Sequence, residues 1–263
     1  MRFRFVCLLP ILLSLFPLLA RAEEWRKAYI ITGHPEISVD TNDGDIRVHV
    51  SDRKDIEAVV ISMGEKIGPS GVQITENQTG NHVSLTVRER NHWGINFHRR
   101  SLRVELDVPR EANLDLHSGD GNVRVFEVKG LVHAETGDGD IEATGTEGSL
   151  RAKTGDGNIR VDATCTELEL HSGDGNITAQ IRQGSKMDSR WIVGTGDGNI
   201  ELRLPESFSA EVDAHTGDGH IDLDFPVTVN GSVRESTIRG KMNGGGQTLE
   251  LRSGDGNISL RKV

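Results

Sequence analysis

The sequence predicts an all-β fold, an elongated two-sheet parallel β-solenoid with coils of about 18 residues. A short phrase recurs along the chain: Ser or Thr, then Gly-Asp-Gly, then Asn, Asp or His, then Ile or Val. In four successive copies the central Asp is Asp120, Asp138, Asp156 and Asp174, so the spacing is constant. Apolar and polar residues alternate on both sides of each copy, as in half-buried strands. A fixed period of alternating strands is typical of a stacked repeat.

Each repeat predicts two short strands joined by a glycine turn. The eight copies have their central Asp at Asp43, Asp120, Asp138, Asp156, Asp174, Asp197, Asp218 and Asp255, and in the first copy Asn42 replaces the first Gly. Apolar residues stand six and four positions before the Asp and three and five after it. We expect glycine to supply the positive φ of a sharp reversal. We expect Asp and Asn side chains to accept hydrogen bonds from turn amides.

An antiparallel β-sandwich or meander is the alternative fold. The solenoid is favoured because like turns in successive coils lie directly on one another, about 4.8 Å apart. The same residues are then selected at every level, whereas a meander places another strand between like turns. Small inward residues such as Ala134, Ala143 and Ala152 also suit two closely packed sheets.

Residues 1–22 are expected to be a secretory signal peptide rather than part of the fold. Arg2 and Arg4 precede an apolar stretch from Phe5 to Leu19, and Ala-Arg-Ala follows it. This order is typical of a signal peptide, and the stretch is short for a membrane span. No later segment is apolar enough to cross a bilayer. We therefore expect export to the periplasm, the cell surface or the exterior, with no transmembrane segment in the mature chain.

The remaining chain divides into two expected regions. Residues 23–110 form an N-terminal β region, with a first coil over 36–50, strands over 55–63, 82–90 and 101–108, and loops over 64–80 and 91–100. Residues 111–263 form the Gly-Asp-Gly solenoid, continuous with 36–110. Insertions at 180–190, 203–210 and 224–248 are expected as loops along one edge of the stack. Arg261 and Lys262 are expected to protect the terminal edge strand from other chains.

Charge and cysteine content narrow the class of protein. Without residues 1–22, 27 basic residues face 40 acidic ones. This balance argues against nucleic acid as a partner but allows bound cations. Cys165 is then the one remaining cysteine, so no internal disulfide can form, and we expect a buried and unreactive thiol.

One segment gathers arginines and aromatic residues in an otherwise acidic chain. Its residues are Arg88, Arg90, Trp93, Phe97, Arg99 and Arg100. A loop of this kind suits contact with an anionic cell-surface glycan or an envelope protein. The alternative is a solvated hairpin whose tip packs on the body of the protein.

The stacked Asp residues raise the question of a bound cation. Carboxylates about 4.8 Å apart repel by about 0.9 kcal/mol per pair even in water. Backbone donors of a structural turn can absorb this repulsion, and this interpretation is favoured. Calcium is the alternative, with Asp120, Asp138, Asp156 and Asp174 as oxygen ligands. No other cofactor is expected.

A polysaccharide-active β-helix enzyme is the competing class. Glycoside chemistry requires carboxylates with different roles, whereas here the same Asp stands in every copy. His117, His171 and His215 share one outward position but do not occupy adjacent coils, so they make a poor metal site. Established nucleophile, zinc and phosphate motifs are absent from the sequence. We therefore expect a non-catalytic protein.

The order of these features resembles a known family. The run from Leu114 to Val123 with its repeats, Val108-Pro109, Leu204-Pro205 and the closing segment from Ser253 to Leu260 resemble the bacterial "putative adhesin" family of β-strand-repeat domains of unknown function. The resemblance covers about residues 36–260. It implies an exported or envelope-associated repeat protein without known catalytic residues, serving as a structural or surface-binding module. A calcium-stabilised glycan-binding protein is the alternative.

Overall fold

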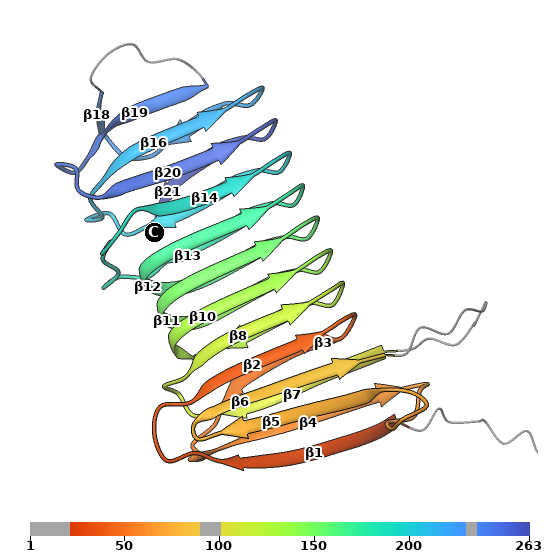
Figure 1. Cartoon of the computed structure of the whole chain (residues 1–263). Helices are drawn as coiled ribbons and strands as arrows, with labels where there is room; N and C mark the ends of the chain where they lie inside the picture. Colours follow the sequence, from red (N-terminus) through yellow and green to blue (C-terminus); the bar gives the residue numbers. More distant parts are fainter. Residues whose placement is uncertain (1–21, 90–100, 230–235) are drawn as a thin grey trace, which may run out of the picture.

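The chain folds into a long stack of β-coils with one edge of short turns (Figure 1). A computed structural model describes residues 22–89, 101–229 and 236–263. Within these ranges the secondary structure is β, with 21 strands and no helix. The expected signal peptide lies outside the described residues except for Ala22, which begins the first strand.

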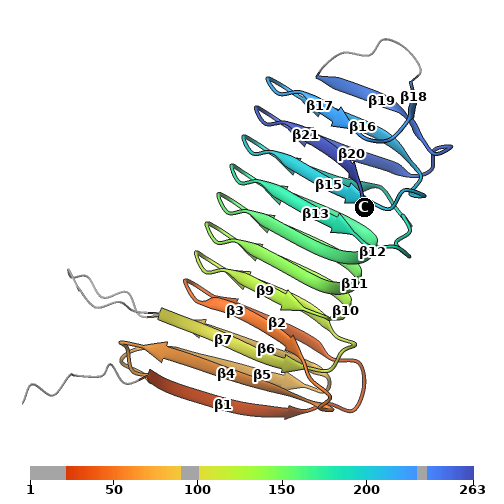
Figure 2. The same cartoon turned by 180° about the vertical axis from the view of Figure 1, so that it is seen from behind.

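Two sheets make up the stack, one on each broad side (Figures 1 and 2). The first contains, in spatial order, β5 (Gln73–Thr79), β6 (His82–Arg88), β2 (Glu36–Thr41), β8 (Asn113–Ser118), β10 (Lys129–Thr136), the second halves of β11 (Ile141–Thr154) and β12 (Ile159–Ser172), β14 (Trp191–Thr195), β20 (Thr248–Ser253), β16 (Ala210–Thr216), β19 (Thr237–Met242) and β18 (Val227–Val229). The second contains β1 (Ala22–Ile30), β4 (Asp55–Met63), β7 (Ser101–Val108), β3 (Asp45–Val50), β9 (Val123–Phe126), the first halves of β11 and β12, β13 (Ile177–Ile181), β15 (Ile200–Leu204), β21 (Ile258–Lys262) and β17 (Ile221–Leu223).

The parallel solenoid is confirmed, and antiparallel pairing is limited to the two ends. Every pair between β2 and β20 in the first sheet, and between β7 and β17 in the second, is parallel. β1, β4 and β5 pair antiparallel at one end, and β18 and β19 do so at the other. The middle of the stack repeats in register, with Ala134 opposite Ala152 and Ile141 opposite Ile159.

The coils do not stack in chain order at the C-terminal end. The last coil, β20–β21, lies between β14–β15 and β16–β17. The expectation that Arg261 and Lys262 protect a terminal edge is therefore wrong, because β21 has a partner strand on both sides. The backbone N–H and C=O groups of β21 therefore find ladder partners in β15 on one side and in β17 on the other. The first coil, β2–β3, is likewise enclosed, between β6–β7 and β8–β9.

Two segments expected as loops contain strands. Residues 64–80 include β5, and residues 224–248 include β18 and β19. In the described part of the chain β5 pairs with β6, and it is largely exposed. Ile74 is its one apolar residue packed against the core, so the strand carries little of the alternation that marks the repeats. β18 and β19 cover the end of the first sheet beyond β16.

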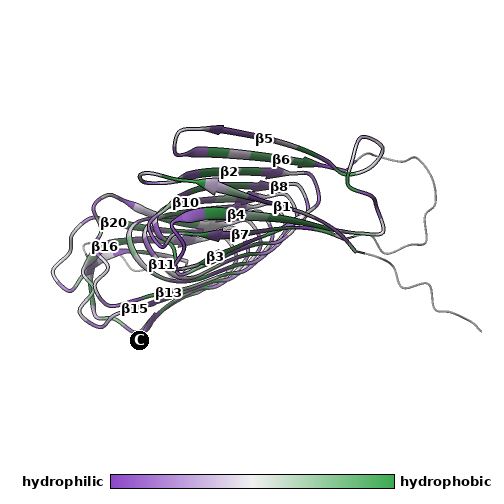
Figure 3. Cartoon of the chain, turned by 90° about the horizontal axis from the view of Figure 1, so that it is seen from below, coloured by the Kyte–Doolittle hydropathy of each residue, from purple (hydrophilic) through white to green (hydrophobic). Residues whose placement is uncertain are grey.

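The core is one continuous cluster between the two sheets, running from Tyr29 to Leu260. The apolar positions around each phrase point inward, and Leu114, Leu150 and Trp191 are almost fully buried. Seen along the stack, the coils lie over one another as a thin double layer (Figure 3). The inward side chains are therefore used for packing, so a binding or functional site must lie on the edges or on the outward faces of the sheets.

Candidate functional sites

The Gly-Asp-Gly turns form one long edge of the stack and are tied together by their hydroxyl residues (Figure 1). Ser172 Oγ donates to the carbonyl of Gly157 in the coil before it, at 2.8 Å. The same oxygen accepts from the amide of Gly175 in its own turn, at 2.9 Å. Ser118, Thr154, Thr195, Thr216 and Ser253 repeat both bonds. Each buried hydroxyl thus joins two coils.

The residue after Gly-Asp-Gly forms a second ladder along the same edge. Asn158 donates its backbone and side-chain N–H groups to Asp140 Oδ1, at 2.8 and 3.1 Å. The next coil repeats this, with Asn176 donating to Asn158 Oδ1. Donation from the Asn158 backbone and then from its side chain lowers the pKa of Asp140, although partial burial opposes this. The prediction that these side chains accept turn amides holds for this position.

The turn glycines are required for close stacking rather than for positive φ. The described glycines with positive φ all lie outside the eight phrases, so that expectation is wrong. A Cβ on Gly157 would lie 1.9 Å from the carbonyl oxygen of Gly139, and one on Gly121 would lie 2.2 Å from that of Gly44. Successive turns therefore approach backbone to backbone, which only a residue without a side chain permits.

The side chain of the central Asp makes no bond between the described coils in the four regular copies, unlike the hydroxyl residue and the residue after Gly-Asp-Gly. Asp120, Asp138, Asp156 and Asp174 lie in successive coils and are exposed. Their backbone amides bond to the coil before, as from Asp156 to Gly137 at 3.2 Å. Among the described residues, no hydrogen bond reaches these four carboxylates. In the part of the chain that the structure describes, none of these four residues belongs to a group of three or more His, Cys, Asp or Glu whose ligand atoms lie within 4.8 Å of one another. Calcium binding therefore stays a prediction.

The expected binding loop can be placed only at its start. Arg88 ends β6, and its guanidinium pairs with Asp40 on the neighbouring β2. Arg90, Trp93, Phe97, Arg99 and Arg100 lie outside the described residues. Binding by this loop stays a prediction, and Arg88 already has an acidic partner within the sheet.

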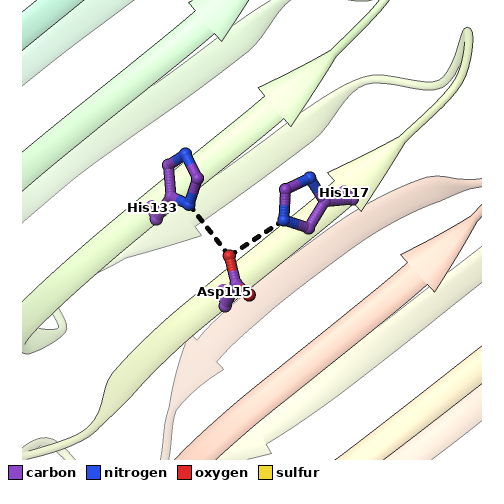
Figure 4. Close-up of side chains that lie close together, drawn as sticks. All are labelled: Asp115, His117 and His133. Carbon is purple, nitrogen blue, oxygen red and sulfur yellow. Dashed lines mark hydrogen bonds and ion pairs between the residues drawn. The ribbon is translucent and has the colours of Figure 1, made fainter.

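Three side chains converge on the outward face of the first sheet (Figure 4). Asp115 and His117 belong to β8, and His133 belongs to the adjacent β10. Asp115 Oδ1 lies 2.9 Å from His117 Nε2 and 2.9 Å from His133 Nδ1. In the described part of the chain this is the one group of three or more His, Cys, Asp or Glu whose ligand atoms lie within 4.8 Å of one another.

Sequence reasoning missed this group because it compared only the outward position of His117, His171 and His215. Those three do lie apart: His171 faces Glu169, and His215 contacts Thr237. The signal that would have found it is Asp-Leu-His at 115–117 followed, one repeat period later, by His-Ala-Glu at 133–135.

The insertions line two adjoining hollows at the edge opposite the turns. One, of about 530 Å³, is lined by Lys186, Met187, Phe208 and Gln247, among others. The other, of about 490 Å³, is lined by Arg182, Glu206 and Val263, and both share Gln183, Pro205 and Ser207. Amide and hydroxyl groups that line a hollow together with apolar side chains such as Met187 and Phe208 are found in sites for small ligands.

Cys165 is buried, as expected. Burial raises the pKa of its thiol to about 12, so the thiolate is scarce at neutral pH. The thiol therefore has a packing role.

In the part of the chain that the structure describes, no helix has the length and apolar character that a membrane span requires.

The fold and its repeated turns define a stacked-coil, all-β repeat protein. The chain belongs to the Toastrack DUF4097 family, whose model matches residues 34–129, 96–195 and 153–261. This confirms the resemblance seen in the sequence. A comparison with curated proteins found no match.

Similar solved structures come from several bacteria. A protein from Clostridium sporogenes, described as a putative cell adhesion protein, shares 13% identity with a TM-score of 0.46, over 92% of this chain and 100% of that one. A putative adhesin from Bacteroides fragilis shares 12% identity with a TM-score of 0.49, over 92% and 97%. One from Parabacteroides merdae shares 12% identity with a TM-score of 0.46, over 90% and 96%.

Proposed function

We propose that this protein is an exported, non-catalytic, adhesin-like module that binds a partner at the cell envelope. Family membership and the signal-like residues 1–22 support this proposal. One observation carries it. The hydroxyl, glycine and amide groups of the repeated phrase are used in bonds between turns, so the repeat builds a scaffold. The residues that differ from coil to coil lie on the outward faces and in the insertions.

The non-catalytic part of the proposal rests on the uniformity of the Asp column. Asp120, Asp138, Asp156 and Asp174 are each exposed at the tip of an equivalent turn. Glycoside hydrolysis ordinarily uses two carboxylates whose environments separate their roles, and equivalent turns do not provide that. Turnover of any polysaccharide by the purified protein would contradict this part.

Two regions are the proposed binding surfaces. One is the arginine- and aromatic-rich segment from Arg88 to Arg100, for an anionic glycan or an envelope protein. The other is the pair of hollows on the insertion edge, where Gln183 and Ser207 offer amide and hydroxyl groups beside Pro205. Polar groups beside an apolar surface suit the two faces of a sugar ring.

A glycan array tests these surfaces separately. Loss of signal on changing Arg99 and Arg100 to Ser would place binding on the first surface. Loss on changing Gln183 and Ser207 to Ala would place it on the second. Arg160 is an exposed arginine on the second sheet, and Arg160→Ser serves as a matched control that should bind normally. Unchanged binding in both variants would contradict both placements.

Fractionation of the native cell tests export. The proposal predicts the protein in the periplasm, on the outer surface or in the medium, with its chain cleaved after Ala22. A protein that remains full-length in the cytoplasm would contradict it.

Calcium-stabilised glycan binding is the second candidate, favoured by the exposed carboxylates of Asp120, Asp138, Asp156 and Asp174 in successive coils. Calcium is held by oxygen ligands of this kind. The scaffold interpretation predicts the same melting temperature with and without millimolar calcium. A rise with calcium, absent with magnesium and absent after Asp138→Asn and Asp156→Asn, would establish the calcium candidate instead.

A further inference from the structure

Four polar side chains form a two-by-two group on the outward face of the first sheet. β8 contributes Asp115 and His117, and β10 contributes His133 and Glu135. The two strands are parallel and in register, with Asp115 opposite His133 and His117 opposite Glu135. Residues two apart on a strand share a face, so all four side chains project to the same side. The rigid ladder fixes their spacing before any ligand arrives.

We propose that Asp115, His117 and His133 bind a zinc ion, with Glu135 orienting one of the two imidazoles. Imidazole nitrogens and a carboxylate oxygen are ligands that zinc takes in proteins. Three protein ligands leave a fourth position for water or a partner group. The site lies on the outward face of the first sheet and close to the turn edge, because His117 directly precedes Ser118 of the repeated phrase.

The distances allow the site with small side-chain movements. Zinc bonds of about 2.0–2.1 Å in a tetrahedral site separate neighbouring ligand atoms by about 3.3 Å. The two contacts from Asp115 Oδ1 to the ring nitrogens are 2.9 Å each, so both must open by a few tenths of an ångström. The donor atoms of all three residues already lie within 4.8 Å. The side chains are 36% to 50% exposed, so they can rotate and the ion can enter.

Glu135 supplies the outer partner that metal-bound imidazoles usually have. When His117 binds through Nε2, its ring proton resides on Nδ1. That atom faces Glu135 Oε2 at 3.6 Å. A carboxylate in this place fixes the tautomer and makes the imidazole a better ligand. Lys153 Nζ lies 3.3 Å from the other oxygen of Glu135, so this neighbouring cation is already paired.

The arrangement occurs at one level of the stack. One coil further, the same two positions hold Arg151 and Lys153, and a further coil holds Glu169 and His171. There Arg151 pairs with Glu169 at 3.0 Å, as on an ordinary solvated face. The group on β8 and β10 is therefore a local departure from the charged ladder around it.

Zinc titration of tag-free protein by calorimetry tests the proposal. We expect one zinc per chain. His133→Ala and His117→Ala should each weaken binding by at least about tenfold, the loss that even an outer partner can cause. Glu135→Gln should weaken binding less than either. Cobalt can replace zinc as a probe, and its visible absorption should report nitrogen ligation in the wild type and change in His133→Ala.

His171→Ala is the matched control, because His171 occupies the same outward column as His117 but lies three coils further along the stack. It should bind zinc as the wild type does. Circular dichroism and melting of each variant show whether the fold is intact. The proposal is overturned if the wild type binds no zinc at millimolar concentration. It is equally overturned if folded His117→Ala and His133→Ala bind with unchanged affinity.

Discussion

Replacing Ser172 by Ala tests whether the hydroxyl bonds hold the coils together. Ser172 is 6% exposed at the end of β12, and its hydroxyl bonds to Gly157 O and Gly175 N. Alanine keeps the backbone and removes only the oxygen. One buried carbonyl and one buried amide then lose their partner.

The structure sets the size of the effect. An unsatisfied buried polar group costs about 1–3 kcal/mol. Two such groups at the edge of the stack, where water can reach one of them in part, give about 2–4 kcal/mol for Ser172→Ala. The stability of a stacked repeat is close to a sum of coil and interface terms, so a loss at one level should register in the whole.

Urea unfolding followed by far-ultraviolet circular dichroism measures this loss, with two controls in the same coil. Ser172→Thr keeps the hydroxyl, and Thr154 and Thr195 make the same bonds elsewhere, so it should stay within about 0.5 kcal/mol of the wild type. Asp174→Ala changes an exposed side chain of the same turn and should also stay within about 0.5 kcal/mol. A Ser172→Ala protein as stable as Asp174→Ala would refute the reasoning.

Three further predictions follow from the described contacts. Gly157→Ala should cost about 3 kcal/mol or more in urea unfolding, because its Cβ would meet backbone, whereas Gly194→Ala, which meets mainly the His171 ring, should cost less. Cys165, whose thiol pKa is raised by burial to about 12, should resist alkylation at pH 8 until denaturant is added; an alkylated Cys165 peptide from the native protein, found by mass spectrometry, would contradict this. Burial raises the pKa of Asp213, but hydrogen bonds from two arginines outweigh it and lower the pKa below its ordinary value. The ionised Asp213 therefore stabilises the folded protein above about pH 4, and this stabilisation is lost as the pH falls through the lowered pKa. In Asp213→Asn the free energy of unfolding should therefore fall less steeply on acidification than in the wild type.

The solenoid itself could be predicted from the sequence, because one short phrase carries the turn, its spacing and the inward alternation. Trp191 and Leu249 follow the repeat and are buried where the pattern places them. The order of the last coils could not be predicted. Asp218 precedes Asp255 in the chain, yet the coil of Asp255 lies inside, because every coil offers nearly the same ladder and the choice is made by long-range pairing.

The candidate sites were only partly accessible to sequence reasoning. The roles of Ser172 and Asn158 in the turns follow from residue type, since both offer hydrogen bonds where a turn requires them. The role of the glycines was misjudged, because close stacking is a property of two coils and not of one turn. The group around Asp115 was missed because it joins two outward positions of the repeat, one that holds Asp115 and His133 and another that holds His117.

The order of the turns along the edge is the central claim, and paired cysteines test it most directly. Turns of adjacent coils lie about 4.8 Å apart, within the Cα separation that a disulfide spans. In a Cys7→Ser background, Asp197→Cys with Asp255→Cys should form a disulfide on mild oxidation, because those coils are neighbours. Asp197→Cys with Asp218→Cys should not, because the last coil separates them. The opposite pattern, with the second pair joined and the first unjoined, would contradict the account.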